Sequence, residues 1–183
     1  MKVVNARAAL HWLVAMSITI QLWLGWWMLG VPKQPPGARA GWFNLHKSIG
    51  ITIAAVVVGW IIWRWINRTS GESTSSMRQL PRWQQRAAHA NHWLLFALMI
   101  VTPLSGLLGS FSTRYPVLYF GFPLPGWNHD WPLAKQVFST LHVTSVWLLM
   151  LVVAVHAAAG LWHWWRRHGV AGAVGLPLRK HPA

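Results

Sequence analysis

Long apolar segments separated by short polar stretches dominate the chain. They cover residues 8–29, 42–65, 85–110 and 136–165. At about 1.5 Å per residue, each helix is long enough to cross the hydrocarbon core of a bilayer, which is about 30 Å thick. The pattern predicts an all-α integral membrane protein, a four-transmembrane-helix bundle formed by a single domain over residues 1–183.

The polar stretches between these segments carry signals that end helices. Prolines and a glycine in residues 31–37 stop the first segment, and the serine-rich residues 67–83 predict a loop outside the membrane. Pro103 is expected to kink the third segment. Residues 112–132 are too rich in proline, glycine and aromatic residues to span, so they predict an aromatic loop at the membrane surface. The first segment contains His11 and Gln21 and lacks a cleavage site, which favours a retained span over a signal peptide.

Composition narrows the class further. Lys and Arg total 16 against two acidic residues, Glu72 and Asp130, and the formal net charge is +14. In a soluble chain this charge would suggest nucleic acid, but here the bases lie between apolar segments, so we expect no nucleic-acid partner. The 16 tryptophans are typical of an interfacial belt. The absence of cysteine excludes disulfides, thiolate haem ligation and iron–sulfur clusters in this chain.

The basic residues also predict orientation, because cytoplasmic loops carry an excess of them. Eleven belong to the side that contains both termini, namely Lys2, Arg7, Arg64, Arg68, Arg78, Arg82, Arg86, Arg166, Arg167, Arg179 and Lys180. Five belong to the other side, namely Lys33, Arg39, Lys47, Arg114 and Lys135. We therefore expect a multi-pass membrane protein with both termini in the cytoplasm.

Histidines mark two depths in the predicted bundle. On the last segment, His142, His156 and His163 lie near one stripe of one helix face. His142 and His156 are separated by about 21 Å along the axis, from fourteen rises of about 1.5 Å. One of these two histidines therefore lies near each membrane surface. Ionisable groups on a spanning helix usually face the bundle interior and are functional.

Depth assigns partners to these two histidines. His46 shares the periplasmic layer with His142. His156 shares the cytoplasmic layer with His11, His89 and His92, and depth does not choose among these three. Two facing imidazoles in a dry bundle suit bis-histidine haem iron, whereas structural zinc would require four ligands in one place. Two other interpretations are hydrogen-bonded structural histidines and the proton-relay groups of a non-redox transporter.

Small residues follow three of the candidate ligands by one helical turn. They are Ala15, Gly50 and Gly160, after His11, His46 and His156. Such residues either let a porphyrin plane approach the backbone or simply let helices pack closely. Three further histidines, His129, His168 and His181, are expected to be ordinary surface residues.

Five sequence pieces resemble the bacterial di-haem cytochrome b561 family, which is related to the cytochrome b subunits of nickel–iron hydrogenases and formate dehydrogenases. They are ALHWLV, NLHKSIGI, AHANHWLLFALMIVTPLSGLL, STLHVTSVW and VHAAAGLWH, which cover essentially the whole chain in order. The resemblance implies two b-type haems, one held by His46 and His142 and the other by His11 and His156. It also implies a location in the bacterial inner membrane and a quinone site near His89, His92 and His163, where imidazoles would relay protons.

Two functions follow from this resemblance. Some small stand-alone members of the family are superoxide oxidases, which pass electrons from periplasmic superoxide to ubiquinone. A basic mouth would attract this anion, and Lys47, Arg39, Arg114 and Lys135, together with Lys33, are the candidates for it. The alternative is an electron-transfer subunit that links quinone to a periplasmic redox protein, with the aromatic loop as a docking surface or as a lid over the haem.

Overall fold

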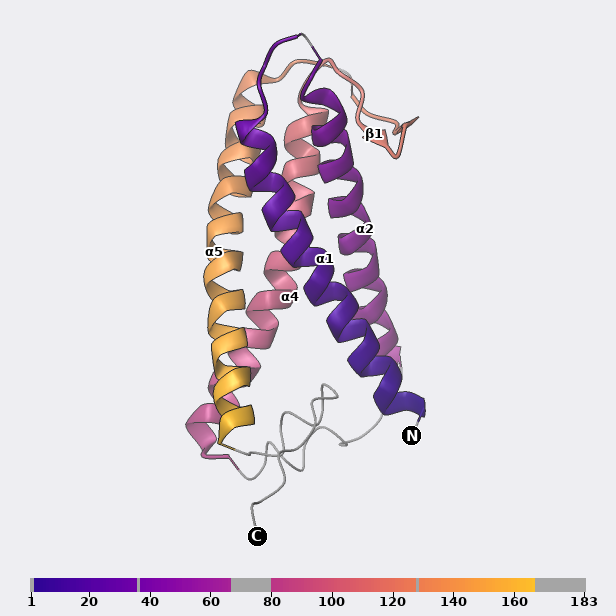
Figure 1. Ribbon diagram of the computed structural model, residues 1–183. Coiled ribbons are helices and arrows are strands. Elements are labelled where there is room, and N and C mark those ends of the chain that lie inside the picture. The colour runs from indigo at the N-terminus through magenta and orange to yellow at the C-terminus, as the bar shows by residue number, and fades with distance from the viewer. Residues whose placement is uncertain (1, 36, 67–79, 128, 167–183) are drawn as a thin grey trace.

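Four long helices make up most of the described part of the chain (Figure 1). The computed structural model describes residues 2–35, 37–66, 80–127 and 129–166. The helices are α1 (Lys2–Gly30), α2 (Ala40–Ile66), α4 (Arg82–Phe111) and α5 (Pro132–Trp165). All four are long and apolar enough to cross a membrane. The prediction of an all-α protein with four membrane-spanning helices is therefore confirmed.

Each helix begins earlier than its apolar segment. α1 starts at Lys2, six residues before the expected start at residue 8, and α5 starts at Pro132, four residues before residue 136. Hydropathy measures only the stretch that lies in hydrocarbon, whereas a helix can continue into the polar interface. Proline is also favourable in the first turn of α5, where its missing N–H is not needed.

The helices pack unequally. α4 packs most closely against α5, and α2 packs against both α4 and α1. Among the described helices, the pairs α1–α5 and α2–α5 are not among those whose backbones approach closely. Two ends of the bundle are distinguished below (Figure 1). The terminal end is where α1 begins and α5 ends, and the hairpin end is where the α1–α2 and α4–α5 connections lie.

An apolar core fills the middle of the bundle. On α5 it contains Leu149 and Val152, which lie in sequence between His142 and His156. The other helices contribute Val14, Ile18, Ile53, Val57, Leu95, Leu98 and Met99. The core therefore separates the two histidine levels with a layer that has few polar groups.

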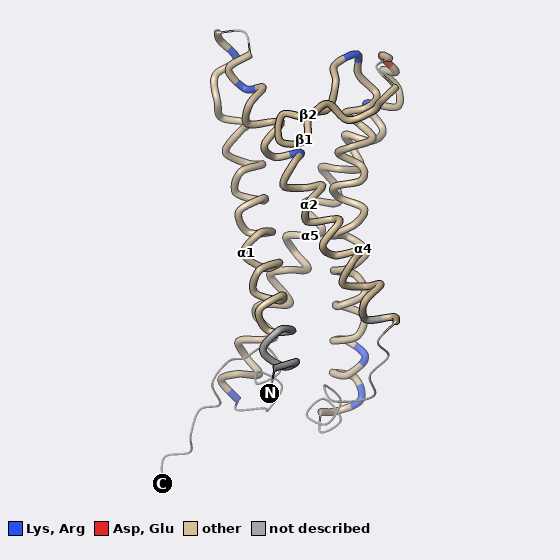
Figure 2. Tube along the Cα trace, turned by 90° about the vertical axis from the view of Figure 1, so that its right-hand side faces the viewer, with Lys and Arg blue, Asp and Glu red and all other residues tan. Residues whose placement is uncertain are grey.

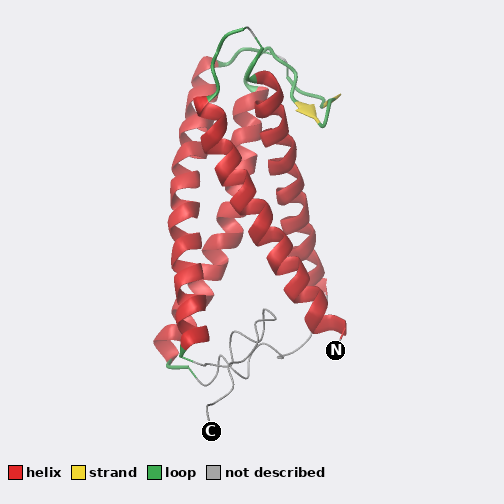
Figure 3. Ribbon diagram, viewed as in Figure 1, coloured by secondary structure: helices red, strands yellow, loops and turns green. Residues whose placement is uncertain are grey.

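The connection between α4 and α5 contains a β-hairpin that the sequence did not predict (Figure 3). Strands β1 (Leu118–Tyr119) and β2 (Phe122–Pro123) pair antiparallel. Phe120 and Gly121 form the turn with φ of 47° and 94°, as expected for a two-residue hairpin turn in which both central residues have positive φ. The hairpin packs on α2. The aromatic loop is thus partly a regular element.

Basic residues lie toward the two ends of the bundle, and the middle of each helix is free of them in the described part of the chain (Figure 2). This distribution fits helices that cross hydrocarbon. Several residues used in the orientation argument or expected at the surface lie outside the described residues, namely Arg68, Arg78, Arg167, Arg179, Lys180, His168 and His181.

Candidate functional site

A first histidine pair joins α2 to α5 near the hairpin end. The ring centres of His46 and His142 lie 6.2 Å apart, and the ring planes are perpendicular at 90°. Both residues are half-buried. This is the pair that depth in the membrane predicted.

A second pair joins α1 to α5 toward the terminal end. The ring centres of His11 and His156 also lie 6.2 Å apart, with the planes at 51°. The ring of His92 lies 5.2 Å from that of His156, at 71°. His89 is exposed on α4. Depth had left three partners open for His156, and two of them are within ring contact of it.

The spacing within each pair can be compared with the needs of a bis-histidine metal centre. A metal lies about 2 Å from an imidazole nitrogen, and the ring centre lies about 1 Å beyond it, so two ligand rings on opposite sides have centres about 6 Å apart. The value of 6.2 Å fits for both pairs. The 5.2 Å between His92 and His156 is too short, which favours His11 as the partner.

Helix packing around the pairs also fits a flat group between the rings. The pairs bridge α2–α5 and α1–α5, the helix pairs whose backbones do not approach closely. Within the described ranges, no cluster of three or more His, Cys, Asp or Glu side chains is arranged to hold a metal ion. Haem needs only two protein ligands per iron, so these residues fit haem better than zinc.

The Nδ1 atoms of the four paired imidazoles differ in hydrogen bonding between α5 and the other two helices. On α5, His142 Nδ1 lies 2.7 Å from the carbonyl oxygen of Thr102, and His156 Nδ1 lies 3.2 Å from the amide nitrogen Nδ2 of Asn91. On α1 and α2, the Nδ1 atoms of His11 and His46 are buried and have no hydrogen-bond partner among the described residues. Because Nδ1 of His142 donates to a carbonyl, its Nε2 is left with a lone pair for a metal.

Two glycines on neighbouring helices make room for the hairpin-end pair. A Cβ on Gly106 of α4 would lie 2.9 Å from His142 Nδ1, and one on Gly25 of α1 would lie 3.1 Å from His46 Cε1. Gly50 instead makes room for the amide of Gln21, whose Nε2 donates to the His46 carbonyl oxygen at 2.6 Å. Among the described residues, nothing beyond the chain neighbours and the backbone of its own helix lies within 4 Å of a Cβ built on Gly160.

The basic residues expected to attract superoxide have different surroundings. The Arg39 guanidinium donates to the carbonyl oxygens of Val31 and Leu29, so it caps the C-terminal end of α1. Arg114 forms an ion pair of 2.7 Å with Asp130. These two guanidiniums are therefore engaged within the protein.

The three lysines at this end complete the set. Lys47 is half-buried on α2 immediately after His46, while Lys33 and Lys135 are exposed. Lys47 is thus the basic residue placed nearest along the chain to the hairpin-end pair.

Residues expected near a quinone lie toward the terminal end but on two helices. His89 and His92 lie one turn apart on α4, and both are exposed. His163 is half-buried two turns after His156 on α5, with its ring 5.0 Å from that of Trp162. Of these three, His92 is the one for which a ring contact with a member of the histidine pairs is described.

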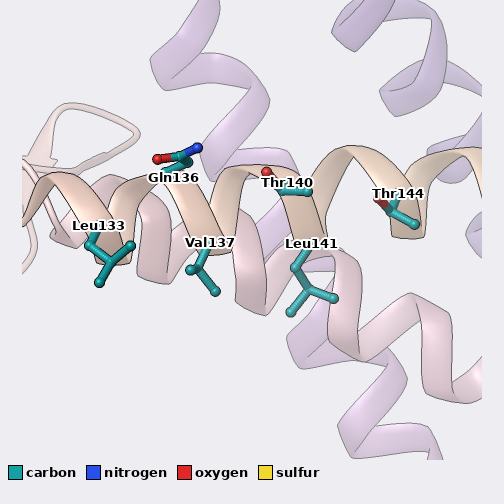
Figure 4. A pocket seen from close by; sticks show the side chains of 6 residues that line it. All are labelled: Leu133, Gln136, Val137, Thr140, Leu141 and Thr144. Atoms are coloured by element: carbon teal, nitrogen blue, oxygen red, sulfur yellow. The ribbon is translucent and has the colours of Figure 1, made fainter.

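A shallow groove on α5 is separate from these sites (Figure 4). Its lining side chains are Leu133, Gln136, Val137, Thr140, Leu141 and Thr144. All six come from one exposed face of a single helix, and none is a histidine. The groove therefore belongs to the outer surface of the bundle.

Sequence reasoning missed the residues that support the imidazoles from other helices. Asn91 and Gly106 lie on α4, and Gly25 lies on α1. Small residues one turn from a ligand on the same helix are visible in the sequence, whereas these close contacts come from neighbouring helices. A polar residue such as Asn91 in an apolar segment was the available signal, because such groups need partners in lipid.

Comparisons with known proteins agree with this architecture. A family model described as prokaryotic cytochrome b561 matches residues 6–173. The chain is 31% identical over 163 residues to a protein of Escherichia coli (strain K12) named cytochrome b561 homolog 2, with 85% of this chain and 81% of that protein covered. Members of this family carry b-type haem and transfer electrons. The chain is therefore a multi-pass protein of the bacterial inner membrane that belongs to the prokaryotic cytochrome b561 family.

Proposed function

We propose that the protein is a di-haem cytochrome that moves electrons across the membrane. In this proposal His46 and His142 ligate one b-type haem, and His11 and His156 ligate the other. The observation that carries the proposal is the recurrence of one spacing, 6.2 Å between ring centres, at two levels of the bundle. When bound, haem iron supplies one-electron redox chemistry.

Orientation assigns the two levels to two compartments. The positive-inside rule favours the terminal end in the cytoplasm and the hairpin end in the periplasm. The His46–His142 pair then lies on the periplasmic side, and the His11–His156 pair lies on the cytoplasmic side. The apolar core lies between the two pairs and would keep water away from the route of the electrons.

The electron donor in this proposal is superoxide, and the acceptor is ubiquinone. Two superoxide anions each lose one electron and leave as O₂, while one quinone takes up two electrons and two protons to become quinol. The protons would reach the quinone through imidazoles at the terminal end. His92 is the best candidate because its ring contacts that of His156, and His89 and His163 lie within two turns of these residues on the same helices.

Lys47 supports superoxide as the donor. It is half-buried and adjoins a proposed ligand, so its ammonium charge would act close to the periplasmic haem. Lys135 and Lys33 would extend the positive field at the same end. Arg39 contributes less than its charge suggests because its guanidinium is held by the carbonyl oxygens of Leu29 and Val31.

Asp130 offsets the charge of Arg114 at neutral pH. A hydrogen bond from the Arg114 backbone N–H, with further bonding and attraction from the guanidinium, holds the pKa of Asp130 below its usual range. The carboxylate therefore stays ionised down to acidic pH. The carboxylate stabilises the loop at every pH above its pKa in the unfolded chain, about 3.9. This stabilisation is lost only as pH falls through the lower pKa of the folded protein.

A superoxide pulse followed by soluble ubiquinone tests this function. We expect a rapid change in haem absorbance on adding superoxide to the oxidised protein, and its reversal on adding quinone. Lys47→Gln should slow the first phase and Asp130→Asn should accelerate it. Each effect is about twofold to fivefold at low ionic strength, since one charge a few ångströms away contributes up to about 1 kcal/mol in water. Arg82→Gln, at the terminal end, is the matched control and should leave this phase unchanged.

A second candidate is an electron-transfer subunit with a periplasmic protein partner. Aromatic side chains at the hairpin end favour this candidate. Trp127 and Trp131 are exposed, and the ring centre of Trp127 lies 6.1 Å from that of Phe111 and 5.3 Å from that of Trp131. Aromatic residues are enriched at protein interfaces as well as at membrane surfaces. Haems that ignore superoxide but are reduced by a quinol would favour this candidate over the superoxide oxidase.

A further inference from the structure

Hydrogen bonding to the imidazoles of α5 comes from α4 at both levels. The backbone carbonyl oxygen of Thr102 lies 2.7 Å from His142 Nδ1, and the side-chain amide nitrogen of Asn91 lies 3.2 Å from His156 Nδ1. The opposite members of the two pairs, His46 and His11, have buried Nδ1 atoms for which the described part of the chain provides no hydrogen-bond partner. Each pair therefore has one imidazole held by α4 and one that is not.

The two supporting groups differ in chemistry. A carbonyl oxygen can only accept a hydrogen bond, and it is fixed by the helix that contains it. A carboxamide accepts through its oxygen or donates through its nitrogen, and a half-turn about its terminal bond exchanges the two. Asn91 therefore determines by its orientation which nitrogen of His156 carries the proton.

Iron ligation selects one of these orientations. An imidazole that gives its Nε2 lone pair to iron must carry its proton on Nδ1. That proton needs an acceptor. The structure places the amide nitrogen of Asn91 against Nδ1, and a half-turn of the amide brings Oδ1 there as the acceptor. The half-buried position of Asn91 limits competition from water.

We propose that Asn91 is the positioning residue of His156, and that its side-chain oxygen, by accepting the Nδ1 proton, sets the reduction potential of the haem held by His156 and His11. The proposal rests on the ligand pairs of the proposed function. A stronger acceptor at this position gives the imidazole more anionic character and stabilises ferric iron, and removal of the acceptor does the reverse. At the other pair, the acceptor for the Nδ1 proton of His142 is the backbone carbonyl oxygen of Thr102, which a side-chain substitution does not remove.

Potentiometric titration of the two haems in the full-length protein tests the proposal. Asn91→Asp keeps an acceptor and adds charge, so it should shift the midpoint of one haem to more negative potential. Asn91→Leu removes the acceptor and should shift the same midpoint to more positive potential or release that haem alone. Gln85→Leu is the matched control, because it removes another carboxamide of α4, one that donates to the Leu80 carbonyl oxygen. Its two midpoints should equal those of the parent.

His11→Ala identifies which midpoint belongs to the haem of His156, since that haem should be missing from the titration. An unchanged midpoint potential for this haem in Asn91→Asp would overturn the proposal. A shifted midpoint potential of the other haem would also overturn it, as would loss of this haem from a variant that retains an acceptor. If His11→Ala removes neither haem or both, the ligand pairing of the proposed function fails instead. The two failures are therefore distinguishable.

Discussion

Gly106 and Gly25 show how closely the backbones of α4 and α1 approach the hairpin-end imidazoles. The position of a Cβ on Gly106 is 2.9 Å from one atom of the His142 ring and 3.0 Å from another. The ring cannot simply swing away, because its Nδ1 is held by the Thr102 carbonyl oxygen. A single methyl group at residue 106 must therefore move a proposed ligand.

Gly106→Ala should weaken the haem of the hairpin end and spare the other haem. Overpacking of this kind also destabilises a protein by about 1–3 kcal/mol. Reduced-minus-oxidised absorbance gives the haem content, and thermal unfolding gives the stability. Gly59→Ala is the control, because a Cβ at Gly59 on α2 would meet no described atom within 4 Å apart from its chain neighbours and the backbone of its own helix. Full content of both haems with an unchanged transition in Gly106→Ala would show that His142 does not need this space.

The β-hairpin is the element that ties the α4–α5 connection to α2. Ser48, which is 1% exposed, donates to the Asn44 carbonyl oxygen at 2.8 Å and accepts from the Phe120 N–H at 2.9 Å. One turn further along α2, the Thr52 hydroxyl lies 3.1 Å from the Tyr119 hydroxyl. These contacts fix the hairpin beside the part of α2 that carries His46 and Lys47.

Ser48→Ala should loosen the hairpin without unfolding the bundle. The Phe120 N–H would lose its acceptor, which costs about 1–2 kcal/mol, so hydrogen exchange over residues 118–123 should accelerate by about 5- to 30-fold. Ser17→Ala provides the control, because the Ser17 hydroxyl bonds only to the Leu13 carbonyl within α1 among the described contacts. Equal exchange in Ser48→Ala and the parent protein would mean that other contacts hold the hairpin.

At the level of the whole molecule, hydropathy predicted the four helices because lipid requires every backbone polar group to be bonded within the segment. It did not predict where helices end in the interface, as the early starts of α1 and α5 show. The hairpin was missed because its turn at Phe120 and Gly121 gives no strong sequence signal, and its position depends on contacts with Ser48 from a distant part of the chain.

Some residues of the candidate site could likewise be predicted from the sequence, and others could not. His46 and His142 could be paired from depth in the membrane alone, since a spanning helix converts sequence position into depth. His11 could not be separated from His92 by depth, and the ring spacings now favour His11. The contributions of Asn91 and Gly106 depend on which faces of α4 and α5 meet, and periodicity within one helix does not determine that.

The central claim is that two histidine pairs hold two haems at two levels. The most direct test is the ratio of extracted haem to polypeptide in the parent protein, His46→Ala and His11→Ala. The account predicts two haems per chain in the parent and one in each variant, with different haems remaining in the two variants, as judged by their midpoint potentials. Retention of both haems in either variant, or a parent that binds a single haem, would contradict it.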